Sequence, residues 1–260
     1  KRLGRGWRGY GIIEGVKTYR DEAIVLRTQD LGEADRIVTA LTRSNGLKRV
    51  VAKGVRRTSS KFGARLEPFT IVDAQFYKGR SLDVLTQAQT LRPYGLQIAS
   101  DFELYTRANV MVETAERLSE DEAHTSMYLL LLGALHALAN RRHSPDLVMN
   151  SFMLRAISMS GWAPSFWDCA VCGRPGPSSS FNVVAGGTVC EACRPPGSLA
   201  PSREAMQLLG DLLSGDWQSA DAAPDFARRE AAGLVAAWVQ WHVERRIKSY
   251  SLINSHLGDV

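Results

Sequence analysis

The sequence has no apolar run long enough to cross a bilayer, which takes about 20 residues. Its longest apolar run, residues 127–139, is shorter and is interrupted by His136. The N-terminal residues also lack the apolar core of about 7 to 15 residues that an export signal requires. These absences favour a cytoplasmic protein that has no membrane among its partners.

Motifs of common enzymes are missing as well. There is no H-E-x-x-H, G-x-S-x-G or S-x-x-K, and the five histidines are scattered along the chain. The P-loop pattern G-x-x-x-x-G-K-[ST] is also absent. Residues 4–9 match G-x-G-x-x-G, but they lack the strand and helix that give this pattern meaning. We therefore expect no enzyme, and we interpret residues 1–18 as a disordered extension or tag remnant.

Acidic residues are scarce in the first third of the chain. Residues 1–95 hold 19 Lys and Arg against 9 Asp and Glu, a balance of +10, whereas residues 96–260 hold 13 against 18, a balance of −5. This division suggests a basic module for a polyanion, joined to a more acidic module. Seven cations and no carboxylate lie within residues 48–65: Lys48, Arg49, Lys53, Arg56, Arg57, Lys61 and Arg65.

This basic stretch predicts a surface for a nucleic-acid strand. Lys48 to Lys53 are expected on a strand, followed by a polar loop whose cations meet successive phosphates. Sequence-tolerant binding of single strands combines such a groove with aromatic stacking. Tyr77 is a candidate for stacking, whereas Phe62 either stacks on a base or anchors the loop in the fold. The alternative is an ordinary solvated loop that happens to be basic.

Short strands separated by turn residues are predicted between residues 19 and 95. The segments 22–27, 34–42, 47–54, 69–77 and 82–89 are rich in Val, Ile, Leu, Thr and aromatic residues. Five strands in about 75 residues favour a small barrel, and the oligonucleotide-binding (OB) fold has that strand count. We expect residues 19–95 to form this nucleic-acid-binding domain.

Helical patterns dominate residues 96–260. Asp101 begins one such segment as a helix cap, and Pro145 begins another in the first helical position. The run Leu129 to Leu132 predicts a central helix that is buried on all sides. Trp238 and Trp241 are interpreted as core anchors. The predicted fold is therefore an α+β multidomain protein, in which an OB barrel precedes a helical domain.

Cysteine is rare, and all four cysteines lie in one Gly- and Pro-rich segment that interrupts the helical domain at residues 165–197. They form two C-x-x-C pairs separated by 17 residues: Cys169, Cys172, Cys190 and Cys193. Two such pairs complete a tetrahedron of thiolates around one Zn²⁺, and four thiolates leave no open position for catalysis. We expect one structural zinc ion. Two disulfides or a redox dithiol are the alternatives.

The chain resembles the RecO family of bacterial recombination mediators and DNA repair proteins. The resemblance rests on "GEADRIV" at residues 32–38 and "AKGVRRTSSKFGARLEPF" at residues 52–69, together with "CAVCGRPGP" and "VCEAC" around the cysteines. It covers about residues 19–251. The family's DNA-binding surface falls here on the basic residues of the barrel: Arg36, Lys48, Arg49, Lys53, Arg56, Arg57, Lys61 and Arg65. Its metal ligands fall on the four cysteines.

The resemblance implies a function without bond-making chemistry. A RecO-like protein binds single- and double-stranded DNA and anneals complementary strands. Together with RecR it assists the loading of RecA onto DNA that is coated by the single-stranded DNA-binding protein. It would act in the cytoplasm, at the nucleoid. The alternative function is that of a zinc-ribbon adaptor for protein partners, with an incidental basic patch.

Overall fold

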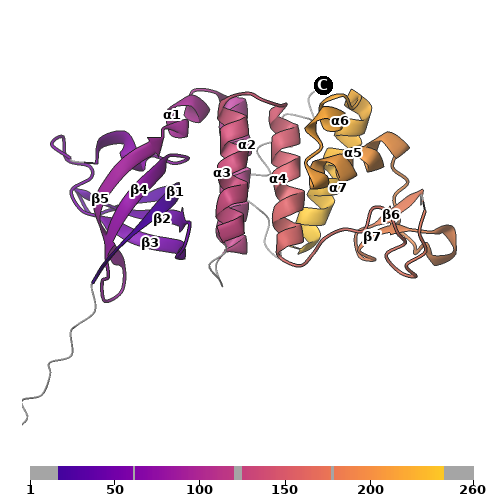
Figure 1. Cartoon of the computed structure of the whole chain (residues 1–260), viewed down its shortest axis with the longest axis horizontal. Coiled ribbons are helices and arrows are strands. Elements are labelled where there is room, and N and C mark those ends of the chain that lie inside the picture. The colour runs from indigo at the N-terminus through magenta and orange to yellow at the C-terminus, as the bar shows by residue number, and fades with distance from the viewer. Residues whose placement is uncertain (1–16, 61, 120–124, 177–178, 243–260) are drawn as a thin grey trace, which may run out of the picture.

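The computed structural model describes residues 17–60, 62–119, 125–176 and 179–242. Figure 1 shows three parts in a row: a barrel of strands at one end, a group of helices in the middle and a small two-stranded module at the other end. Most of residues 1–18, for which we expected a disordered extension, lie outside the described residues.

The five predicted N-terminal strands are confirmed. They are β1 (Thr18–Leu31), β2 (Asp35–Thr42), β3 (Gly46–Ala52), β4 (Ile71–Tyr77) and β5 (Asp83–Arg92). Their order is β1-β2-β3-β5-β4 in a closed barrel of the OB type. β3 and β5 close it as a parallel pair, through Val50 opposite Asp83 and Val51 opposite Val84. The predicted OB-like barrel is thus present.

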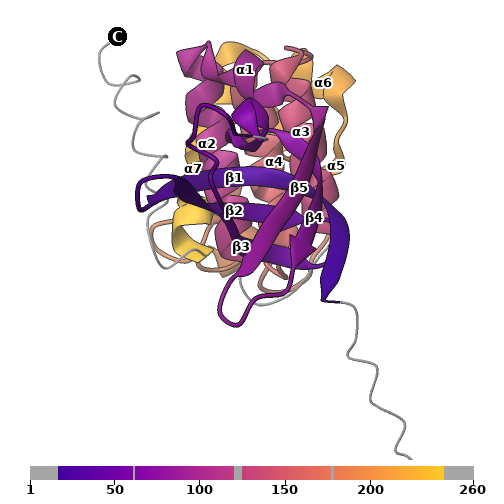
Figure 2. The same ribbon diagram turned by 90° about the vertical axis from the view of Figure 1, so that its left-hand side faces the viewer.

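Strand β1 is buried on both of its faces. Ala23 and Val25 point into the barrel, whereas Ile24 and Leu26 belong to the hydrophobic core that the helices share. Successive side chains of a strand point to opposite faces, so the apolar run 23–26 serves two cores at once. A register shift between Val25 and Arg27 bends β1 where it passes from β4 to β2 as its partner. Figure 2, viewed from the barrel side, shows the helices stacked behind this sheet.

Residues 53–69, here called the basic loop, connect β3 to β4 and are anchored in both cores. Phe62 and Leu66 are each only 2% exposed and pack inside the barrel. Phe69 packs with the helices and meets the ring of Tyr105 edge-on, at 5.9 Å between centroids. It adopts a φ of +67°, a left-handed conformation that is strained for a bulky side chain. Its N–H donates to the carbonyl of Val25 at 2.8 Å, which holds it there.

The helical region contains seven α-helices among the described residues. They are α1 (Tyr94–Ala99), α2 (Phe102–Leu118), α3 (Thr125–Ala139), α4 (Pro145–Met159), α5 (Arg203–Ser214), α6 (Trp217–Asp221) and α7 (Asp225–His242). Asp101 caps α2 by accepting the N–H of Leu104, and Pro145 begins α4, both as predicted. None of these helices is both long and apolar enough to cross a membrane.

Two predictions about burial in this region are wrong. Helix α3 is not buried on all sides, because Leu129 is 49% exposed and Gly133 faces open space. The helix packs on α2 and α4 and also contacts α1 and β2, whereas the side that carries Leu129 and Gly133 is exposed. Trp238 is a core residue as expected, but Trp241 is 56% exposed. A step of three residues turns an α-helix by about 300°, so the two side chains point in different directions. The stripe of the helix that faces the core therefore ends between Trp238 and Trp241.

The cap of α2 provides a pH-dependent contribution to stability. The N–H of Leu104 and then the guanidinium of Arg141 hold the pKa of Asp101 below its usual value. A depressed folded-state pKa means that stability is gained above the unfolded-state pKa of about 3.9 and is lost as pH falls further. We therefore expect Asp101→Asn to melt at a lower temperature than the wild type at pH 7, and we expect a smaller gap between the two melting temperatures at pH 3. Circular dichroism melts at both pH values test this, and an equal gap at both would contradict it.

Candidate nucleic-acid interface and metal site

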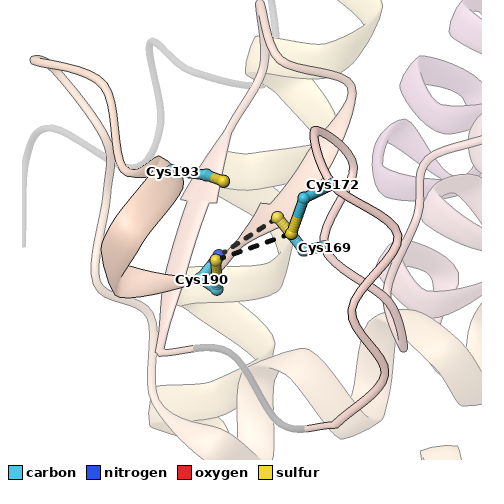
Figure 3. Close-up of side chains that lie close together, drawn as sticks. All are labelled: Cys169, Cys172, Cys190 and Cys193. Atoms are coloured by element: carbon cyan, nitrogen blue, oxygen red, sulfur yellow. Dashed lines mark hydrogen bonds between the residues drawn. The ribbon is translucent and has the colours of Figure 1, made fainter.

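The four cysteines converge as their spacing predicted. Their sulfur atoms all lie within 4.8 Å of one another, and the Sγ atoms of Cys172 and Cys190 are 3.9 Å apart. Figure 3 shows the two C-x-x-C turns facing each other, with the sulfur atoms gathered between them. Four thiolates around one zinc ion at about 2.3 Å would lie about 3.8 Å apart. The described geometry is thus close to a tetrahedral metal site and needs only a small contraction.

Backbone hydrogen bonds shape both cysteine turns. The N–H of Gly173 donates to the carbonyl of Cys169 at 2.8 Å, and the N–H of Cys193 donates to that of Cys190 at 3.0 Å. The N–H of Cys190 also points at the sulfur of Cys169, at 3.4 Å. Donors aimed at a sulfur favour its thiolate form. The site is therefore preorganised for anionic ligands before any ion is bound.

The surroundings of Cys169 and Cys193 shift the pKa values of these two thiols in opposite directions. Backbone N–H groups, first that of Cys190 and then that of Cys172, lower the pKa of Cys169 to about 6. Hydrogen bonds with Cys190 and then Cys172 raise the pKa of Cys193 to about 12. A first thiolate thus forms readily, while a second close by is disfavoured. A bound divalent cation removes this conflict, because it stabilises all four thiolates together.

A small framework fixes the cysteine turns to the helices. It consists of β6 (Ser180–Asn182), β7 (Gly187–Val189) and the 3₁₀ helix η2 (Glu191–Cys193). Phe181 stands between Phe166 and Trp238 of α7, with ring centroids 6.3 and 5.8 Å away. Gly187 has a φ of +142°, and a Cβ there would lie 2.2 Å from the carbonyl oxygen of Ser165. Only glycine allows this close approach.

The basic residues do not form one continuous row along the barrel. Lys48 and Arg49 are consecutive in β3 and therefore point to opposite faces, Lys48 on the face of the buried Val50. Strand β3 ends at Ala52, so Lys53 already belongs to the basic loop. The predicted contact residue Lys61 lies outside the described residues.

Carboxylates from outside the basic stretch partly neutralise it. Arg36 contacts Asp30 and Glu67, each at 3.2 Å. Arg56 lies 3.4 Å from Asp30, and its guanidinium donates to the carbonyl of Gly32 at 3.1 Å. Residues 48–65 contain no carboxylate, and these carboxylates come from β1 and from the end of the basic loop. Arg36 and Arg56 thus help to shape the loop as well as charge it.

The remaining described cations face solvent around the loop. Lys53 and Arg57 are exposed and form no ion pair with any carboxylate of the described residues, and Arg65 is exposed on the 3₁₀ helix η1 (Gly63–Leu66). Phe62, for which the sequence left two roles open, anchors the loop inside the barrel. Tyr77 is 41% exposed, at the end of β4. Loop cations on a barrel of the OB type form a surface suited to a polyanionic strand.

The fold and the cysteine group define a class: proteins with an OB-like barrel, a helical region and a four-thiolate module of the metal-binding type. Comparison with known families and proteins agrees with this architecture. Residues 16–94 match the family described as "Recombination protein O N terminal", and residues 99–251 match "Recombination protein O C terminal".

Curated relatives extend the match over most of the chain. "DNA repair protein RecO" of Streptomyces coelicolor is 53% identical over 242 residues, covering 90% of this chain and 98% of that protein. The protein of the same name from Thermobifida fusca is 53% identical over 240 residues, covering 92% and 99%. The chain belongs to the RecO family of DNA repair proteins.

Proposed function

We propose that the protein binds single- and double-stranded DNA through the barrel and anneals complementary strands. With RecR it would assist the loading of RecA onto DNA coated by the single-stranded DNA-binding protein. The observation that carries this proposal is the set of exposed cations on the basic loop. Phe62 and Leu66 hold this loop on an OB-like barrel, and the chain belongs to the RecO family. In this proposal residues 19–95 bind DNA, and residues 96–260 form a helical domain around the module at 165–197.

Annealing needs neutralisation of charge rather than a reacting side chain. Two complementary strands repel each other through their phosphates, and a cationic surface that contacts both lowers this repulsion. Among the cations that the structure describes, Lys48 is half-buried, and four others are exposed: Arg49, Lys53, Arg57 and Arg65. The proposed contact set adds Arg36, Arg56 and Lys61.

Binding should depend strongly on salt. Each phosphate contact of a single strand changes the slope of log K against log salt by about −0.7, so four to seven contacts predict a slope between about −3 and −5. Fluorescence anisotropy with a labelled oligonucleotide between 50 and 300 mM salt measures this slope. A strand-annealing assay on the same preparation tests the activity. A slope weaker than about −1, or annealing no faster than without protein, would refute the proposal.

We propose Zn²⁺ as the ion held by Cys169, Cys172, Cys190 and Cys193. Zinc prefers tetrahedral thiolate ligands, and all four donors come from one module whose apolar residues are few. When bound, the ion would supply a structural cross-link between the two cysteine turns, with no open position for a reacting water. Phe181 packs between Phe166 and Trp238 of α7, so a cross-linked module would also keep this contact with α7 in place.

A protein-contact role for this module is the second candidate function. Trp167, Val171 and Val184 are 61%, 59% and 69% exposed on it, and large apolar side chains of this kind are enriched where proteins meet. A filter-binding assay with single-stranded DNA separates the two functions. Absence of single-stranded DNA binding by the wild type would favour the adaptor function.

A further inference from the structure

A hollow of about 380 Å³ lies between the basic loop and the first helix. Ser60, residues 62–65 and Glu67 form one side, and Thr70, Thr90, Pro93 and Leu96 form the other. The volume is at the small end of the range for ligand sites, so it suits one nucleotide rather than a helix or a strand of protein.

The lining combines apolar side chains with hydrogen-bonding groups. Ala64, Pro93 and Leu96 supply accessible apolar surface, whereas Phe62 is only 2% exposed; Leu96 is 72% exposed, so one wall is open to solvent. The hydroxyl groups of Ser60, Thr70 and Thr90 and the carboxylate of Glu67 also border the hollow. A nucleobase presents this same combination, with two apolar faces and an edge of donors and acceptors.

The walls are held rigidly. Phe62 and Leu66 fix the loop side from within the barrel, and Phe69 fixes its end among the helices. Gly95 lies so close to the loop that a Cβ there would be 2.6 Å from the carbonyl oxygen of Pro68. The backbone on both sides of the hollow is therefore anchored by buried side chains and close packing, and a preformed site lowers the entropic cost of binding.

Charge around the hollow favours a ligand that carries phosphates. Arg65 lines it, and Arg36 contacts the lining residue Glu67 at 3.2 Å. Arg57 lies earlier on the same loop and is exposed. A strand whose phosphates follow these cations would present its bases to the opening next to them.

We propose that this hollow receives one unstacked base of a single-stranded DNA, while the neighbouring phosphates stay on the loop cations. The inference rests on the proposed DNA binding and deepens it. Bases of a duplex are paired and stacked and cannot enter, so the hollow gives the protein a preference for single strands. Burial of the apolar faces of a base against Ala64, Pro93 and Leu96 would strengthen binding by about tenfold.

Filling the hollow tests this. Ala64 is exposed on η1 and lines the hollow, so Ala64→Trp would occupy it; Ser59→Trp places the same side chain on the same loop outside the lining. Each variant and the wild type are titrated with a thymidine oligonucleotide, an abasic oligonucleotide of equal length, and a duplex. The wild type and Ser59→Trp should bind the thymidine strand about tenfold more tightly than the abasic strand. Ala64→Trp should bind the two within about twofold, with its duplex affinity unchanged.

The outcomes separate the two proposals. No binding of any of the three polymers by the wild type would sink the proposed function itself. Equal binding of thymidine and abasic strands by the wild type, or a full preference retained by Ala64→Trp, would overturn only the base site. Thymidine monophosphate serves as a further competitor: displacement of the strand by micromolar amounts would show a site for free nucleotides instead. If Ala64→Trp does not fold by circular dichroism, Leu96→Glu, at the exposed wall, replaces it and should lower the thymidine preference in the same way.

Discussion

Replacing Lys53 and Arg57 together with glutamate is expected to lower the affinity for single-stranded DNA by on the order of 100-fold at about 0.1 M salt. Each lost phosphate contact removes about 0.7 from log K at that salt concentration, and each introduced carboxylate adds repulsion. The two residues are chosen because both are exposed and unpaired with any described carboxylate. Arg56 is left in place, because its bonds to Asp30 and Gly32 support the loop.

A matched control separates local contact from overall charge. Lys78→Glu with Arg80→Glu changes the net charge by the same amount, in the exposed turn between β4 and β5. This control should lose less than about fivefold in affinity, since long-range attraction alone is screened beyond about 10 Å at 0.1 M salt. Equal losses in the two double variants would mean that the basic loop is not the contact surface. Fluorescence anisotropy gives the affinities, and circular dichroism shows that both variants fold.

Cys190→Ala is expected to remove the bound ion altogether. Three thiolates cannot complete the tetrahedron, and structural zinc binding in small modules contributes about 10–16 kcal/mol of apparent free energy near pH 7. The metal content of the purified protein should fall from about one ion per chain to less than about 0.1. Mass spectrometry of the metals measures this, and it also identifies the ion in the wild type.

Loss of the ion should stay confined to one end of the molecule. The module lies beyond the helices from the barrel (Figure 1), so DNA affinity should remain within about twofold. Limited proteolysis should cut between residues 165 and 197 in Cys190→Ala and leave the wild type intact. Val171→Ala is the control, because Val171 is 59% exposed between two of the cysteines and supplies no ligand atom. Unchanged metal content in Cys190→Ala would refute the ligand assignment.

Local sequence patterns were sufficient where short-range chemistry decides the structure. The C-x-x-C pairs predicted the thiolate group because a tight turn brings both sulfur atoms to one point. The caps at Asp101 and Pro145 and the five strands followed from residue preferences at those positions. In each case neighbours within a few residues carry the information.

Features formed by distant segments were not predictable in this way. The hollow beside η1 joins loop residues to Thr90 and Leu96, about 30 residues further on, and no periodicity connects them. Likewise, the pairing of Arg36 with Asp30 and Glu67 depends on how the barrel closes. Helix α3 has apolar residues on every side, so its sequence does not reveal which side the other helices cover.

The closure of the barrel has a consequence for hydrogen exchange. The parallel seam between β3 and β5 consists of two residue pairs, whereas each of the other strand pairings in the barrel has seven or eight. Amides at this seam should exchange with solvent through the lowest-energy opening of the barrel. Because β3 leads directly into the basic loop at Lys53, a ligand that fixes the loop also restrains the seam. Slower deuterium uptake at Val50 and Val51 would thus report DNA binding from inside the barrel wall, at residues that the DNA itself does not need to touch.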